Sequence, residues 1–243
     1  MPKTQDIEIT GFDTMASAME FVDNYNNWIL GKFSPYMGKN FLEVGTGQGN
    51  FKKMLEPRSS SYVSIDIDKQ VIDRAQLRDP SGKYVVADAS SNDFTQRLSP
   101  FTVDTVICIN VLEHIPDDKT ALNNMVNTMK KGGHLLLFSP SFMHLYNDLD
   151  KLAGHVRRYT KKDIVKLLES NRDCEIVMNE YFNPIGAFGW WVNKFITHKN
   201  INSNNVNKQV MIFDKYVVPF SKMLNIFTKH LWGQSIYCVI QKK

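Results

Sequence analysis

The amino-acid sequence predicts an α/β fold, in which a mostly parallel sheet carries helices on both faces. Two observations predict this fold class. Short runs of β-branched and other apolar residues recur along the chain, and stretches with apolar residues at three- and four-residue steps separate many of them. Because the short runs are almost continuously apolar, their strands are expected to be covered on both faces, as in βαβ units.

The first expected element is a helix near the N-terminus. Apolar side chains recur at helical spacing from Phe12 to Phe33, and the pattern ends between Gly31 and Pro35. We therefore expect residues 1–35 to form a helical cap ahead of the sheet.

Strands and helices then follow one another along the chain. A capping box, Thr160-x-x-Asp163, marks the start of one helix. Strands are expected at residues 40–44, 61–66, 83–87, 103–110, 134–138, 174–182 and 235–241, and helices at 49–55, through 71–75, at 121–129 and at 164–168.

An aromatic-rich insert, residues 183–233, separates the last two strands. Its apolar side chains predict a lid over an acceptor pocket, while an interfacial surface on a membrane and a dimer interface stay open as alternatives. The Asn-rich stretch 200–207 is expected to be a mobile loop.

Composition and charge describe one folded domain. The 243 residues are 43% hydrophobic and 22% charged, which is enough to bury a sizeable core, and the length favours a single domain over residues 1–243. The net charge of +4 is not gathered in a basic arm, so we expect no nucleic-acid partner.

Three further features point to the cytoplasm. The N-terminal segment has no secretory signal pattern, and no apolar run is long enough to span a bilayer. Cys108, Cys174 and Cys238 are well separated in apolar stretches, so they are expected to be buried thiols in a reducing compartment, with no metal cluster.

The strongest local signal is a glycine-rich turn. The sequence Leu-Glu-Val-Gly-Thr-Gly-Gln-Gly, residues 42–49, leads from a strand into a helix. Glycines there let the backbone turn sharply and let a ligand lie beside the positive end of a helix. The spacing is GxGxG, whereas the dinucleotide fingerprint is GxGxxG.

Acidic and polar residues follow the next strands. Asp66 ends the second strand, Asp88 ends the third, and Asn110 follows the fourth. The carboxyl ends of parallel strands meet at one edge, where open α/β sheets bind ligands, and a carboxylate such as Asp66 can accept both ribose hydroxyls. The alternatives are structural: Asp66 as a helix cap, Asp88 in a turn, and Glu43 as a support for the glycine loop.

With these residues the chain resembles the class I S-adenosylmethionine (SAM)-dependent methyltransferases over essentially its full length. It further resembles a bacterial subgroup often associated with glycosyltransferases. The subgroup's motifs are Tyr-Asn-x-Trp-Ile at residues 25–29, Leu145-Tyr146 followed by Asp150, and Gly-His-x-Arg-Arg-Tyr at residues 154–159. One departure is residues 171–174, where the family has Gly-Phe.

The resemblance implies a Rossmann-like fold of seven mostly parallel strands with an antiparallel last strand. It implies SAM as the cofactor, with Glu43 in the acidic position of the first motif, Asp66 on the ribose and Asp88-Ala89 on the adenine side. The residues expected to bind the cofactor are Tyr25, Glu43, Gly45, Thr46, Gly47, Gly49, Asp66, Ile67, Asp88, Ala89, Asn110 and Val111.

The acceptor side is less defined. His114 and His155 are candidates for a catalytic base, the alternative being packing or a salt-bridged connector. Arginines can pair with an anionic acceptor through two hydrogen bonds. The residues expected to bind the acceptor are Tyr146, Arg157, Arg158, Tyr159 and Trp190.

The expected activity is methyl transfer from SAM to a small-molecule, sugar or lipid-linked acceptor, with O-methylation favoured. No transmembrane segment is expected, and peripheral membrane contact and a homodimer stay open. The alternatives are an N-methyltransferase for a heterocycle or amine, a nicotinamide-dependent oxidoreductase, and a non-catalytic cofactor-binding partner. The glycine spacing and the lack of a Tyr-x-x-x-Lys pair disfavour the oxidoreductase.

Overall fold

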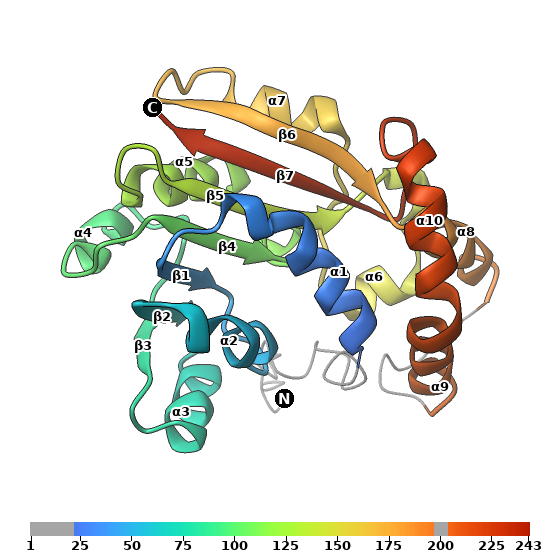
Figure 1. Ribbon diagram of the computed structural model, residues 1–243, viewed down its shortest axis with the longest axis horizontal. Helices are drawn as coiled ribbons and strands as arrows, with labels where there is room; N and C mark the ends of the chain where they lie inside the picture. Colours follow the sequence, from blue (N-terminus) through green and yellow to red (C-terminus); the bar gives the residue numbers. More distant parts are fainter. Residues whose placement is uncertain (1–21, 197–203) are drawn as a thin grey trace, which may run out of the picture.

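The computed structural model describes residues 22–196 and 204–243, with side chains in the second segment described from residue 208. These residues form a seven-stranded sheet with helices on both faces (Figure 1). The strands are β1 (Asn40–Val44), β2 (Ser61–Asp66), β3 (Lys83–Val86), β4 (Thr105–Ile109), β5 (His134–Pro140), β6 (Cys174–Phe182) and β7 (Ser235–Lys242).

The strand order is β3-β2-β1-β4-β5-β7-β6. Strands β1 to β5 pair in parallel, and β7 lies antiparallel between β5 and β6. The predicted fold class, a mostly parallel sheet with an antiparallel last strand, is therefore confirmed.

Helices connect most of the strands, and the helices of the insert gather at one end of the sheet. They are α1 (Asp23–Phe33), α2 (Asn50–Leu55), α3 (Lys69–Arg78), α4 (Phe94–Leu98), α5 (Asp118–Thr128), α6 (Asp148–Leu152), α7 (Lys161–Leu168), α8 (Pro184–Asn193), α9 (Asn204–Ile212) and α10 (Val218–Thr228). Short turns are η2 (Ser34–Tyr36), η3 (Glu56–Arg58), η4 (Leu112–His114) and η5 (Met143–Leu145), and η6 (Phe213–Val217) is a π-helical turn. None of the helices in the described ranges is long and apolar enough to cross a bilayer.

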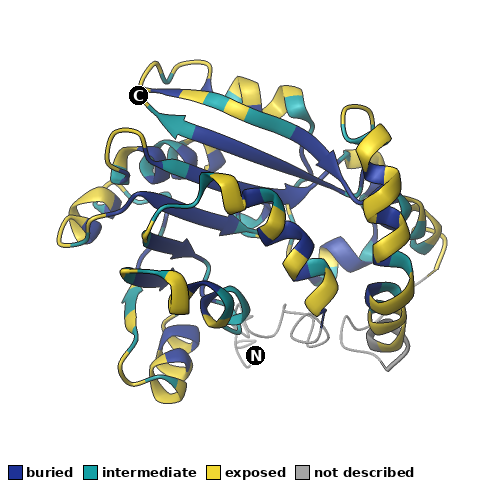
Figure 2. Ribbon diagram, viewed as in Figure 1, coloured by how far each residue is buried: buried dark blue, intermediate teal, exposed yellow. Residues whose placement is uncertain are grey.

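Alternate residues of each central strand belong to two separate cores, because successive side chains of a strand point to opposite faces. On β5, Leu135 and Leu137 pack with the cluster that includes residues of α4, α5 and α7, whereas Leu136 and Phe138 pack with residues of α1 and α10. The central strands are accordingly buried, while the outer helical faces are exposed (Figure 2). The three cysteines are buried and free, as predicted.

The observed elements differ from the predicted ones at α4, at α6 and in the Asn-rich stretch. Helices α4 and α6 were not predicted, because five residues are too few to show helical periodicity. The N-terminal helix was predicted from Phe12, and the structure shows it from Asp23. Residues 12–21 lie outside the described ranges. The Asn-rich loop prediction is wrong for residues 204–207, which begin α9, and residues 200–203 are not described.

The insert supports α1 through one carboxylate. Asp214 in η6 accepts hydrogen bonds from the backbone N–H groups of Asn24 (3.2 Å) and Tyr25 (2.8 Å). These two N–H groups belong to the first turn of α1, where backbone N–H groups have no acceptor within the helix. A negative charge at this end of a helix is also favourable. Residues far apart in the sequence thus join at the end of the sheet where α8, α9 and α10 gather (Figure 1).

Candidate active site

A cavity of ≈ 780 Å³ lies at the carboxyl edge of the parallel strands. Its walls come from the ends of β1, β2 and β4 and from α1, α8 and η6. Every residue predicted to bind the cofactor lines it: Tyr25, Glu43, Gly45, Thr46, Gly47, Gly49, Asp66, Ile67, Asp88, Ala89, Asn110 and Val111.

The glycine loop is held close to its neighbours. The backbone N–H groups of Gly45 and Thr46 both donate to the Ile65 carbonyl, at 2.8 and 2.9 Å. Gly45 has φ +82°, and a Cβ built there would lie 2.4 Å from Val111 Cγ2. Only glycine combines this conformation with this close approach, so a larger residue would push the loop away from Val111.

Asp66 faces the cavity and does not cap the helix that follows. The side chain of Asp68 caps α3 by accepting from the Gln70 N–H at 2.8 Å. Asp66 Oδ1 accepts from the Asp68 N–H at 3.0 Å, which orients the carboxylate toward the rim. Burial raises the pKa of Asp66, partly offset by backbone hydrogen bonds. The helix-cap alternative for Asp66 is therefore wrong.

Asp88 and Asn110 shape the neighbouring strand ends. Asp88 Oδ1 accepts from both the N–H and the hydroxyl of Ser90, at 2.8 and 2.7 Å, so its turn role and its place in the cavity wall coexist. Asn110 has φ +53° and donates its backbone N–H to the Phe138 carbonyl at 2.8 Å. A non-glycine residue with positive φ at a strand end is a feature that functional sites often contain.

Glu43 is buried at the base of the cavity. It is 3% exposed, and its Oε2 accepts from the Ser64 hydroxyl at 2.8 Å. Burial raises the pKa of Glu43 to about 8, against the opposing effect of hydrogen bonds and of Lys52. Near neutral pH this carboxyl group therefore keeps its proton in a large share of molecules.

Tyr25 reaches the same cavity from α1. Its ring packs edge-on against Phe138 and Phe182, with centroids 6.3 and 5.6 Å away. Burial raises the pKa of Tyr25 to about 12, so its hydroxyl stays protonated and can donate a hydrogen bond.

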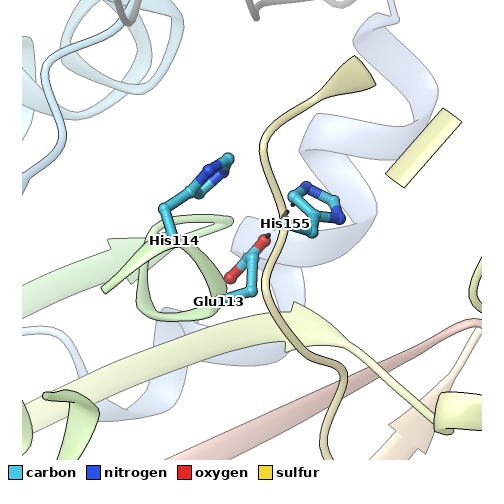
Figure 3. Close-up of side chains that lie close together, drawn as sticks. All are labelled: Glu113, His114 and His155. Atoms are coloured by element: carbon cyan, nitrogen blue, oxygen red, sulfur yellow. Dashed lines mark ion pairs between the residues drawn. The ribbon is translucent and has the colours of Figure 1, made fainter. Parts of the chain in front are cut away.

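Three titratable side chains lie close together beside the cavity. Glu113 and His114 lie in η4, directly after β4, and His155 lies in the connector between α6 and α7 (Figure 3). The rings of His114 and His155 are 4.8 Å apart and nearly perpendicular, and both line the cavity. Burial lowers the pKa of His114. We call Glu113, His114 and His155 the polar cluster.

A buried carboxylate positions His155. Asp150 Oδ1 lies 2.8 Å from both His155 Nδ1 and Arg158 Nε, and its Oδ2 accepts from Trp190 Nε1 at 3.1 Å. Burial raises the pKa of Asp150, but the hydrogen bond with His155 and the charge of Arg158 outweigh it and lower the pKa. The Arg158 guanidinium also lies 5.3 Å from the centre of the Trp190 ring.

The predicted acceptor residues divide into two groups. Arg158 and Trp190 line the cavity, whereas Tyr146, Arg157 and Tyr159 do not. The Tyr146 hydroxyl donates to the His155 carbonyl, and Arg157 and Tyr159 both bind Asp118. For these three residues the structure shows connector contacts, so we propose no acceptor contact for them.

Several cavity residues were not predicted from the sequence to bind the cofactor or the acceptor. Val22 directly precedes α1, Asn26 and Ile29 belong to α1, and Phe213 and Asp214 come from the insert. Asp150 was visible as part of a motif, five residues before His155, yet its contact with that ring depends on the turn after α6.

Comparison with known proteins agrees with this geometry. Residues 42–135 match the family described as "Methyltransferase domain". A curated relative, ubiquinone biosynthesis O-methyltransferase of Vibrio cholerae, is 27% identical over 184 residues, covering 73% of this chain and 75% of the relative.

Two solved structures share the fold. The crystal structure of a SAM-dependent methyltransferase from Archaeoglobus fulgidus aligns with a TM-score of 0.55 and 19% identity, covering 92% of this chain and 94% of that one. N-methyltransferase NodS of Bradyrhizobium japonicum, in complex with S-adenosyl-L-homocysteine, aligns with a TM-score of 0.51 and 15% identity, covering 93% and 88%. The association with glycosyltransferases stays a prediction. The matched domain and the curated relative support a SAM-dependent methyltransferase activity for this chain, and the solved structures show that it shares the class I methyltransferase fold.

Proposed function

We propose that this enzyme transfers the methyl group of SAM to a hydroxyl oxygen of a small molecule with a largely apolar body. The observation that carries the proposal is the pair of histidines of the polar cluster, His114 and His155, which line a cavity otherwise bordered by many apolar residues. A hydroxyl must lose its proton on methylation, and an imidazole can accept it. The name of the Vibrio cholerae relative, which specifies O-methylation in ubiquinone biosynthesis, supports the same acceptor atom.

The cofactor would occupy the part of the cavity between the glycine loop and the ends of β2 and β3. We infer that Asp66 accepts hydrogen bonds from the ribose hydroxyls and that Asp88 and Ala89 border the adenine. Tyr25 and the glycine loop would then border the methionine end. Support comes from their shared cavity and from the freedom of Asp66 from helix capping.

The acceptor would lie against α8, beside Trp190 and Arg158. The outer face of the insert adds support for a lipid-linked acceptor and for peripheral contact with a membrane, because many of its large apolar side chains are exposed. Association of two copies through the same face is the alternative. These side chains are Phe188, Trp191, Val192, Phe195, Ile196, Met211, Ile212, Tyr216, Phe220, Met223, Leu224, Ile226, Phe227 and Leu231.

Methyl transfer needs little covalent chemistry from the protein, since the cofactor carries the activated group. The acceptor oxygen forms a bond to the methyl carbon as the carbon–sulfur bond breaks, S-adenosylhomocysteine leaves, and the hydroxyl proton passes to His155 or His114. Positioning alone can supply about 7–11 kcal/mol of such a barrier. The role of this chain is therefore to align the acceptor oxygen with the methyl carbon and to take up the proton.

The test is a calorimetric titration with SAM, with NADH and NADPH in parallel, followed by transfer of labelled methyl to a panel of acceptors. We expect saturable binding of SAM alone and transfer to hydroxylated apolar acceptors. The His155→Ala variant should lower turnover by at least about 10²-fold, whereas His230→Ala, on the surface, should not change it. Binding of a nicotinamide alone, or transfer only to amines, would contradict the proposal.

Replacing Asp66 by alanine is expected to weaken SAM binding by about 1–3 kcal/mol, because the charged hydrogen bonds to the ribose are lost. Asp73→Ala is the control, since Asp73 is an exposed residue of α3 that pairs with Lys69. Calorimetry of both variants measures the difference. An unchanged affinity in Asp66→Ala would contradict the ribose contact.

A further inference from the structure

The polar cluster has the composition of a metal site, and its side chains need to close slightly around an ion, because two ligand atoms of one zinc ion lie at most about 4.4 Å apart. One ligand atom of each residue, Glu113, His114 and His155, lies within 4.8 Å of the others. The cluster joins two elements that are far apart in the sequence, the turn η4 and the connector after α6 (Figure 3).

Glu113 presents an oxygen without a partner. The side chain has no solvent exposure, and its Oε2 accepts from the Ser139 hydroxyl at 2.9 Å. Among the described residues, its Oε1 has no hydrogen-bond donor. A buried carboxylate oxygen without a partner is costly, so it calls for a ligand that supplies positive charge or a proton.

His155 presents a lone pair to that oxygen. Its Nδ1 lies 2.8 Å from the Asp150 carboxylate, which accepts hydrogen bonds, so Nδ1 carries the proton and Nε2 is left free. Nε2 lies 3.8 Å from Glu113 Oε1, too far for a hydrogen bond. Two ligand atoms at about 2.2 Å from one zinc ion lie up to about 3.8 Å apart when the angle between the bonds opens to about 120°.

Each ligand also has an outer partner that fixes its orientation. Ser139 donates to Glu113, Asp150 holds His155, and the backbone of Gly154 hydrogen-bonds to His114. Such outer contacts are typical of metal sites, in which the second nitrogen of a ligating histidine is bound to a carboxylate or a carbonyl.

We propose that Glu113, His114 and His155 bind one divalent transition-metal ion, with Zn²⁺ as the best match. Two imidazoles and one carboxylate suit Zn²⁺, whereas Mg²⁺ and Ca²⁺ prefer oxygen ligands. Both histidines border the cavity, so the remaining coordination position faces the place where the acceptor would lie.

This proposal rests on the proposed function for its catalytic meaning. A bound ion would lower the pKa of the acceptor hydroxyl, and His114 and His155 would then be ligands, so the acceptor proton would leave to solvent instead of passing to either imidazole. The acceptor oxygen then bonds to the methyl carbon as the carbon–sulfur bond breaks. The metal site itself stands on the contacts of the cluster and can be tested without any acceptor.

The experiment uses the full chain, stripped with a chelator and titrated with Zn²⁺ against a chromophoric competitor. We expect about one tight site per chain. Glu113→Gln and His155→Ala should each weaken Zn²⁺ binding by at least about 100-fold, and Ser139→Ala by about 10- to 100-fold, as losses of outer partners do. His230→Ala should leave the affinity unchanged, and Co²⁺ should give a visible spectrum that His155→Ala abolishes.

Two results would overturn the site: no stoichiometric binding by the wild type, or equal binding by Glu113→Gln and His155→Ala. Circular dichroism and SAM titration check that each variant is folded, and His114→Ala replaces Glu113→Gln if the latter does not fold. SAM binding and methyl transfer without Zn²⁺ binding would refute the ion alone. Zn²⁺ binding in a protein that neither binds SAM nor transfers methyl would refute the proposed function alone.

Discussion

Replacing Arg158 by methionine is expected to destabilise the fold by about 3–5 kcal/mol, because it leaves a buried charge without its partner. The side chains of Arg158 and Asp150 are 1% and 0% exposed, and Arg158 Nε lies 2.8 Å from Asp150 Oδ1. Methionine keeps most of the aliphatic stem of the arginine. The lost stability is therefore due mainly to the Asp150 carboxylate, which keeps its contacts with His155 and Trp190 but loses the opposite charge of Arg158.

The neighbouring arginine provides a matched control for this prediction. Arg157 pairs with Asp118 at 2.5 Å, but its side chain is 31% exposed. Arg157→Met should therefore cost about 1 kcal/mol or less, as partly exposed ion pairs do. Urea unfolding at pH 7 measures both variants, and equal losses would show that the Asp150 pair is not the more important one.

Replacing Glu43 by glutamine is expected to flatten the dependence of stability on pH. The pKa of Glu43 is raised to about 8 in the folded chain from the model-compound value of 4.5. Between these two values the folded state holds a proton that the unfolded state releases, so stability falls as pH rises. At 1.36 kcal/mol per pKa unit, the wild type loses about 3–4 kcal/mol between pH 5 and pH 8 through this group.

The Glu43→Gln variant removes this titration, so its stability relative to the wild type should increase steadily from pH 5 to pH 8. The exposed Glu175 of β6, which lies near Lys243, provides the control, because Glu175→Gln should shift stability by less than about 0.5 kcal/mol at any pH in this range. Urea unfolding at several pH values measures both. A parallel profile for Glu43→Gln and wild type would contradict the raised pKa.

The sheet and the cofactor side of the cavity were predictable from the sequence for one physical reason. Buried parallel strands are continuous apolar runs, and each run ends where the chain turns toward the next helix. The glycine loop follows β1, and Asp66 ends β2. These residues therefore meet at one edge of the sheet, and their meeting does not depend on the conformation of the other loops. Even the choice between Asp66 and Asp68 as helix cap follows from position, since the cap directly precedes α3.

The acceptor side could not be predicted in the same way. In an irregular connector no periodicity sets the direction of a side chain, so adjacent residues such as Arg157 and Arg158 point to different partners. The polar cluster was missed as a metal site because its ligands come from two elements that are separated by α5, β5, η5 and α6. Only the fold brings Glu113 within 3.8 Å of His155.

The place of β7 in the sheet also sets the order in which the sheet can be completed. Within the described sheet, β6 pairs only with β7, and β6 ends at Phe182 whereas β7 begins at Ser235. During synthesis at about 5–20 residues per second, β6 therefore waits about 3–10 s for its partner strand to be made. Until then the edge of β6 is unpaired. The apolar insert is made in the same interval, before β7 is available to complete the sheet beside the insert. The late synthesis of the antiparallel strand thus leaves this part of the nascent chain open to aggregation and to chaperones.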